Sequence, residues 1–262
     1  MSSIYHYTSL DATIKILQKD KICFWGTRYD SMNDPTDYIY AKDIVIPLLK
    51  DVIDIADVDA YDKDDLEAFP YIVSFSNVDD DFNMWRMYKA EVALEFDRAA
   101  IKNHLEHNTK EFVFLEECCY PDIDEMHRMF ATKLNTINLG QGLMLAARHT
   151  LAFIKRKNYI NEHEVRLVAF DHAGATFHKG EIIEQEIAHD IGIRTIRNKD
   201  LVLYKEFLLP KEALTGIIIN SNGKKHYESL KKHLQLWLLQ QNYNHNITIR
   251  KSETGAYINL NI

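Results

Sequence analysis

The order of strand-like and helix-like segments constrains the fold of this chain more than any other feature. Short apolar or alternating segments typical of strands recur along the whole chain, whereas the apolar spacing typical of helices is concentrated in two long regions. Strands and helices therefore do not alternate one for one, as a doubly wound parallel sheet requires. We expect an α+β fold with a mixed, mostly antiparallel sheet and flanking helices.

The same patterns predict the individual elements. Helices are expected at 10–17, with Ser9 as the N-cap, and at 44–55, 84–88, 124–157 and 223–241. Strands are expected at 4–8, 22–25, 71–76, 90–96, 112–120, 164–170, 181–188, 195–209 and 215–219, with two short ones within 247–260.

Nothing in the sequence predicts a flexible joint between domains. There is no internal repeat, no low-complexity tract and no linker rich in proline and glycine, and the whole chain has 5 prolines. We therefore expect a single domain over residues 1–262. It would include a helical insertion at about 121–157 and a C-terminal helix with short strands at 223–262.

Charge and cysteine content limit the cellular location and the partners that we expect for the protein. The net charge of −8 disfavours a strongly basic surface for nucleic acid. No apolar run reaches the ~18 residues that a membrane span needs, and no signal peptide is evident. Two of the 3 cysteines, Cys118 and Cys119, are adjacent, which does not suit a disulfide framework. We expect a cytoplasmic protein without a membrane partner.

Several common chemistries lack their motifs. The sequence contains no GxGxxG, GxxxxGK[ST], CxxC, HExxH or GxSxG segment. His104 and His107 have the spacing of a ligand pair, but no third ligand is evident, so we expect no metal site. A metal-dependent nuclease that uses Asp79 to Asp81 with Glu162 and Glu164 is kept as an alternative, since adjacent aspartates in a loop are usually just solvated.

Two polar segments near the N-terminus could form part of a site. Alternation along the first strand places His6 and Thr8 on one face and Tyr5 and Tyr7 on the other. Either His6 and Thr8 form a hydrogen-bonding wall, or His6 is a core histidine and the residues after it cap a helix. Farther on, Trp25-Gly26-Thr27-Arg28-Tyr29 leads to an Asn33-Asp34-Pro35 turn, and the fork of Arg28 suits phosphate.

Two later segments also carry candidate residues. Trp85 and Tyr88 have the spacing of neighbours on a helix, where they either pack into the core or stack on a flat ligand. Glu162, Glu164 and Arg166 are expected on one face of a strand or its lead-in. Such charges either form an exposed ladder or line a cleft, where paired carboxylates can stabilise a cationic transition state or orient a hydroxyl.

The order of these segments resembles the bacterial family catalogued as domain of unknown function 2971. The similar motifs are an opening strand with Tyr-Thr-Ser at 7–9, the Asn-Asp-Pro turn at 33–35, Met-Trp-x-x-Tyr at 84–88 and Tyr-x-x-Glu-x-Glu-x-Arg at 159–166. The resemblance covers about residues 4–235. It departs from the family pattern at Lys89-Ala90-Glu91, where a glycine is expected. This family resemblance supplies no activity.

A second resemblance does supply one. His6-Tyr7-Thr8 and Glu162-His163-Glu164 are similar to the His-x-Thr and Glu-x-Glu elements of ADP-ribosyltransferases. The resemblance implies a split mixed sheet with an NAD cleft between its halves. It implies that Glu164 is catalytic and that Glu162 orients the nucleophile. The NAD-binding residues that it implies are His6, Tyr7, Thr8, Trp25, Arg28, Tyr29, Asn33, Trp85 and Arg166.

The function implied is an NAD-dependent ADP-ribosyltransferase of the kind found among bacterial toxins and antiphage effectors. NAD would be its substrate, and a nucleic acid or protein would be the acceptor, with an antitoxin or immunity protein as a partner. Two alternatives stay open: an NAD glycohydrolase, and a non-enzymatic module that binds a nucleotide or a protein.

Overall fold

The computed structural model describes most of the chain. The described residues are 2–32, 39–43, 47, 70–108, 113–136, 149–170, 177–178, 181–182, 191–195, 201–221, 223–244 and 246–254. The expected helix at 44–55 lies outside them except for Pro47, as does the Asn33-Asp34-Pro35 turn. No helix of the described part is long and apolar enough to cross a membrane.

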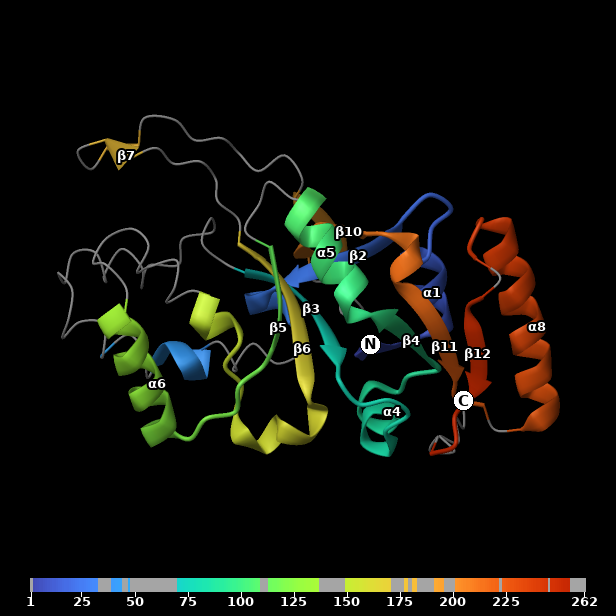
Figure 1. Cartoon of the computed structure of the whole chain (residues 1–262), viewed down its shortest axis with the longest axis horizontal. Coiled ribbons are helices and arrows are strands. Elements are labelled where there is room, and N and C mark those ends of the chain that lie inside the picture. The colour runs from blue at the N-terminus through green and yellow to red at the C-terminus, as the bar shows by residue number, and fades with distance from the viewer. Residues whose placement is uncertain are drawn as a thin grey trace.

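The first half of the chain forms strands and helices close to the expected ranges (Figure 1). Ser9 caps α1 as expected, because its side chain accepts a hydrogen bond from the Ala12 amide. The elements are β1 (Ser3–Thr8), α1 (Leu10–Ile16), β2 (Ile22–Arg28), a 3₁₀ turn (Tyr29–Ser31), β3 (Pro70–Ser76), α4 (Phe82–Tyr88), β4 (Val92–Asp97), α5 (Arg98–Asn108) and β5 (Val113–Glu117).

The second half is also mixed. Its elements are α6 (Ile123–Thr136), a 3₁₀ helix (Lys157–Glu162), β6 (Glu164–Phe170), β7 (Phe177–His178), β8 (Glu181–Ile182), β9 (Ile191–Thr195), β10 (Leu201–Leu209), a 3₁₀ turn (Lys211–Ala213), β11 (Leu214–Ile219), α8 (Lys224–Gln240) and β12 (Thr248–Lys251). The prediction of one helical region over 124–157 is wrong at its end. Ile154 leaves the helix to form a bridge with Cys119.

The strands form a 10-stranded sheet that branches at β3. The order is β12-β11-β4-β1-β3-β2-β10-β9, and β6 and then β5 continue from the other edge of β3. Only the β11–β12 pair is parallel among the described pairs, which confirms a mixed, mostly antiparallel sheet.

One edge of β3 holds two different neighbours. β1 pairs at one end, where Tyr5 lies opposite Ser76, and β2 pairs at the other end, where Thr27 lies opposite Ile72. β6 pairs with the opposite edge along all of β3. The sheet therefore divides into one arm that begins with β1 and a second arm that begins with β2.

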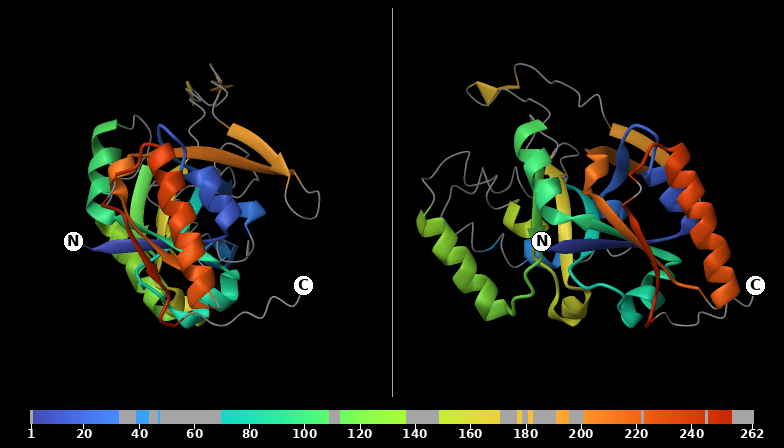
Figure 2. Two further views of the ribbon diagram at one scale, coloured as in Figure 1. Left: turned by 90° about the vertical axis from the view of Figure 1, so that its right-hand side faces the viewer. Right: turned by 45° about the vertical axis from the view of Figure 1, so that its right-hand side comes forward.

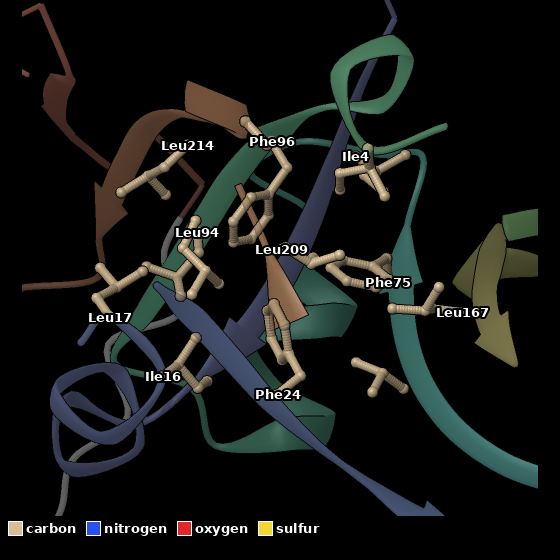
Figure 3. Packing of buried hydrophobic residues seen from close by; sticks show 14 of the residues in the cluster. Ile4, Ile16, Leu17, Phe24, Phe75, Leu94, Phe96, Leu167, Leu209 and Leu214 are labelled. Carbon is tan, nitrogen blue, oxygen red and sulfur yellow. The ribbon is translucent and has the colours of Figure 1, made fainter. Parts of the chain in front are cut away.

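The main hydrophobic core covers one face of this sheet, called here the inner face. Residues of α1, α5 and α8 pack there against alternate strand residues. Figure 3 shows Ile16 of α1 in this core with Phe24, Phe75 and Phe96. The outer face carries a smaller apolar cluster, in which Met84 and Trp85 of α4 contact Tyr5 and Tyr7. Helices α6 and α8 lie at opposite ends of the molecule (Figures 1 and 2).

Candidate functional site

Four charged side chains form a buried group on the outer face, called here the ion cluster: Lys155, Glu162, Glu164 and Arg166. Each is between 3% and 7% exposed. Lys155 Nζ donates to Glu162 Oε2 at 2.5 Å and to Glu164 Oε2 at 2.8 Å. Arg166 Nε donates to Glu164 Oε1 at 3.0 Å. An exposed charge ladder is therefore wrong for these residues, because β6 lies between β3 and β5 and its outer face is covered.

The pleat of β6 explains why two members of the ion cluster, Glu164 and Arg166, lie on the same face. Glu164 and Arg166 alternate with Val165 and Leu167, which lie in the core. Glu162 arrives differently, from the last turn of the 3₁₀ helix. His163 then adopts a left-handed conformation (φ 43°) and turns the chain into β6. Lys155 comes from the irregular segment before that helix.

Neutral groups complete the surroundings of Glu164. Ser74 Oγ, on the neighbouring β3, donates to Glu164 Oε1 at 2.5 Å. The backbone amide of Glu164 donates to the Tyr120 hydroxyl at 2.8 Å, and Arg166 Nη1 donates to the Ala152 carbonyl at 2.7 Å. The Glu164 carboxylate therefore accepts hydrogen bonds from three side chains on both of its oxygens.

The two carboxylates have pKa values displaced in opposite directions. Burial raises the pKa of Glu164, but the positive charges of Arg166 and Lys155 outweigh burial and lower that pKa to about 2. Burial raises the pKa of Glu162 above its ordinary value, and the charge of Lys155 only partly opposes this. Burial lowers the pKa of Lys155, but the two glutamates outweigh it and raise the pKa.

Glu162 keeps one oxygen open. Its Oε2 accepts from Lys155 and, at 3.3 Å, from the hydroxyl of the exposed Tyr88. None of the described residues donates a hydrogen bond to Oε1. Glu162 is therefore the carboxylate of the ion cluster with capacity for a further partner.

His6 lies on the other face of the sheet from Glu164. Tyr5 pairs with Ser76 and Ser76 pairs with Glu164, so Tyr5 shares the outer face with Glu164 and His6 points to the inner face. The His6 ring packs against Phe24 and Phe75, and burial lowers its pKa. Of the two alternatives for His6, the structure shows a histidine packed in the core followed by a helix cap, and the register separates His6 and Thr8 from the glutamates.

His6 is nevertheless connected to the ion cluster through β3. Its Nδ1 donates to the Ser74 carbonyl at 2.9 Å, at the point where β1 and β2 diverge, and the Ser74 hydroxyl bonds Glu164. A carbonyl can only accept, so Nδ1 carries the proton. His6 thus fixes the backbone that presents Ser74.

Several other expected NAD contacts are occupied by the fold. Trp85 is 0% exposed and its indole NH donates to Asp80, so no ligand ring can stack on it in this conformation. The Tyr7 hydroxyl donates to the Val78 carbonyl and accepts from the Asp81 amide. Tyr29 is buried beside the end of β2. Arg28 points to the inner face, because it pairs with the core residue Tyr71.

The two remaining expected NAD contacts differ. Trp25 is 38% exposed on the outer face of the second arm, away from the ion cluster in the sheet order. Asn33 lies outside the described residues. Among the described residues of the expected set, Glu162, Glu164 and Arg166 meet in the ion cluster, and Tyr7 and Trp85 contact each other in the smaller apolar cluster.

The aspartates weighed for a nuclease have structural partners. Asp80 accepts hydrogen bonds from Trp85, from Ser252 and from the Glu253 amide, so it ties the C-terminal segment to α4. Asp81 caps α4 by accepting from the Met84 amide. Within the described ranges, no group of three or more His, Cys, Asp or Glu side chains could hold a metal ion.

A surface cavity lies beside Tyr120. It has a volume of about 380 Å³, and it is lined by Cys119, Tyr120, Pro121, Glu125, Arg128 and Met129. The Tyr120 hydroxyl accepts a hydrogen bond from the Glu164 amide, so Tyr120 connects the rim of the cavity to the strand that carries the ion cluster.

Sequence reasoning missed three residues of this site. Ser74 had a signal, because Ser74 and Ser76 interrupt an otherwise apolar strand at a spacing of two. Lys155 and Tyr120 had no such signal in the sequence, because both lie in segments that only the tertiary fold brings to β6.

Comparison with known protein families, with curated proteins and with solved structures finds no match for this chain. The two resemblances drawn from short motifs therefore stay predictions.

Proposed function

We propose that the chain is an NAD-dependent ADP-ribosyltransferase that works at the ion cluster. One observation carries this proposal. Glu162 and Glu164 both pair with the buried ammonium of Lys155, and the pKa values of the two carboxylates are displaced in opposite directions. Two neighbouring carboxylates with pKa values displaced in opposite directions are typical of sites where one group exchanges a proton and the other stays ionised.

The proposed reaction begins at the nicotinamide ribose. The bond between C1′ and the pyridinium nitrogen breaks, and its electron pair leaves with neutral nicotinamide. The positive charge left on the ribose resembles the oxocarbenium state of glycoside cleavage. Glu164, held ionised by Arg166 and Lys155, keeps negative charge beside that state.

Glu162 takes the second part of the reaction. A hydroxyl or amine of the acceptor attacks C1′ and gives its proton to the open oxygen of Glu162, whose raised pKa suits a general base. Tyr88, exposed at the surface and bonded to Glu162, lies where an acceptor would approach. The role of a cytoplasmic toxin or antiphage effector with a macromolecular acceptor rests on the motif resemblance.

The test follows a label from NAD. Wild-type protein is incubated with NAD labelled in its adenylate phosphate, alone and with RNA, DNA or cell lysate, and both label transfer and nicotinamide release are measured. Glu162→Gln should lower the rate by roughly 10²–10⁴, the usual contribution of a general base. Glu106→Gln, an exposed glutamate of α5, is the matched control and should leave the rate unchanged.

The outcomes separate the alternatives. Nicotinamide release without transfer would identify an NAD glycohydrolase. Neither release nor transfer under any condition would contradict the proposal. Circular dichroism and thermal unfolding of each variant show whether a lost rate reflects a lost fold.

A further inference from the structure

A second group of side chains lies on the outer face of the other arm, and the proposed reaction does not use it. Trp25 and Thr27 come from β2, Tyr204 from β10 and Arg194 from β9; together they are called here the Trp25 surface. Thr27 pairs with Tyr204 and with Ile72, and Ile72 pairs with Val168. The Trp25 surface and the ion cluster therefore share the outer face.

The two aromatic rings form a flat platform. Trp25 and Tyr204 stack with their centroids 4.7 Å apart and their planes at 28°. Gly192 lies under the Tyr204 ring, and a Cβ at this position would be 2.3 Å from the ring. A residue without a side chain is therefore required for Tyr204 to keep this position, while Trp25 stays 38% exposed.

Arg194 brings a positive charge to the edge of this platform. Its guanidinium carbon is 5.9 Å from the Trp25 centroid and 6.0 Å from the Tyr204 centroid. Its Nη2 donates to Thr27 Oγ1 at 2.6 Å, which fixes the side chain.

The charge of Arg194 is unbalanced. Its Nε is buried without a hydrogen-bond partner, and none of the described carboxylates forms an ion pair with it. A guanidinium without a carboxylate partner keeps its charge for an anion, which its terminal nitrogens can contact. The geometry therefore combines a stacking surface with a positive charge that no described carboxylate balances.

We propose that the Trp25 surface binds a free nucleotide, with the base on Trp25 and a phosphate on Arg194. Bases stack on exposed aromatic rings irrespective of sequence, and guanidinium forks match phosphate oxygens. The surroundings favour one nucleotide over a nucleic-acid strand. The neighbouring charges, Lys21 and Glu206, pair with each other at 3.6 Å, and the chain has a net charge of −8. A strand needs a continuous positive groove.

The test uses tryptophan fluorescence and calorimetry with AMP, adenosine and inorganic phosphate as probes. Of the 3 tryptophans, Trp85 is fully buried and Trp237 packs against the main core, so Trp25 should report stacking. AMP should quench the fluorescence and bind more tightly than adenosine. Trp25→Ala should weaken AMP binding about tenfold or more by calorimetry.

Arg194→Gln should weaken AMP binding about tenfold and leave adenosine binding unchanged, because only the phosphate contact is lost. Leu208→Ala is the matched control, since Leu208 is exposed on the same strand as Tyr204 and should not affect binding. AMP binding that both Trp25→Ala and Arg194→Gln leave intact would overturn the proposal, as would no binding of AMP at millimolar concentration.

Two further binding measurements identify the source of the nucleotide. In the Glu162→Gln variant, NAD that competes with AMP would identify the ligand as the adenylate half of NAD, and NAD that does not compete would identify a separate nucleotide. A single-stranded oligonucleotide that binds while AMP does not would overturn the assignment to a free nucleotide. None of these measurements depends on turnover, so the site can stand if the proposed reaction fails, and the reverse also holds.

Discussion

Arg166 and Arg194 lie on the same face of one sheet and have opposite surroundings. Arg166 is almost fully buried, donates twice to Glu164 and once to the Ala152 carbonyl, and shares a group of two cations and two carboxylates. Arg194 is only partly buried, contacts two aromatic rings and one hydroxyl, and has no carboxylate partner in the described part of the chain. We therefore expect the fold to depend on Arg166 and its partners, whereas Arg194 is available to a ligand.

The largest loss of stability is expected when the charge balance around Arg166 is removed. Glu164→Gln keeps the shape of the side chain but leaves Lys155 and Arg166 with Glu162 as the one carboxylate of the ion cluster. Because a buried pair that loses one partner leaves an uncompensated charge, we expect the free energy of unfolding to fall by about 3–5 kcal/mol. Arg194→Gln should change it by less than about 1 kcal/mol. Urea denaturation of both variants measures the difference, and equal losses would end the contrast between the two arginines.

Lowering the pH should reduce the stability of the ion cluster around Arg166 but not that of the Trp25 surface around Arg194. The pKa of Glu164 is about 2 in the folded protein and has its ordinary value of 4.5 in the unfolded chain. Its contribution to stability is therefore complete above about pH 4.5 and is lost as the pH falls toward 2. Unfolding measured at several pH values in this window should show a steeper loss for the wild type than for Glu164→Gln. Parallel curves would mean that Glu164 does not carry the linkage.

A smaller effect is expected from filling the space under Tyr204. The Cβ of Gly192→Ala would lie 2.3–2.6 Å from the Tyr204 ring and hydroxyl, so the ring must move off the platform. We expect a loss of roughly 1–3 kcal/mol, typical of overpacking, and a changed emission of Trp25. Gly223→Ala adds the same methyl group where its Cβ would meet nothing within 4 Å, and it should leave the emission of Trp25 unchanged. Unchanged emission would show that Tyr204 does not need Gly192 to stack.

The smallest effect concerns the open carboxylate of the ion cluster. Tyr88→Phe removes a hydroxyl that donates to Glu162 at 3.3 Å and that favours the ionised carboxylate. The pKa of Glu162 should therefore rise slightly further. Under the proposed reaction, the acid limb of the pH profile for nicotinamide release should move to higher pH by a fraction of a unit. A limb that moves to lower pH would exclude Glu162 as the general base.

Local patterns were enough to predict most of the strands. β3 and β6 appear where expected, because apolar and β-branched residues continue over the length of a strand. The branch at β3 could not be predicted, since it depends on pairing with segments near residues 5, 27 and 168 that are distant in sequence. The end of the expected helix at 124–157 failed for the same reason, because a bridge from Ile154 to Cys119 overrides helical propensity.

The candidate site was predictable only within one strand. The period of two placed Glu164 and Arg166 together correctly. It could not place His6 relative to them, because a shift of one residue in the register between β1 and β3 would reverse the face of every side chain. Lys155, which joins the two glutamates, lies in a run of three basic residues at 155–157 that is typical of an exposed surface, and only the tertiary fold brings it to the glutamates.

The branch at β3 also sets an order for events on the ribosome. About 90 residues separate β3 from β6, and until β6 emerges one edge of β3 has unpaired amides and carbonyls. At ~5–20 residues per second, that edge stays open for roughly 5 to 20 seconds. An open apolar strand edge recruits other strands, including those of neighbouring nascent chains. Expression yield should therefore depend on translation speed between β3 and β6 and on chaperones that cover such edges.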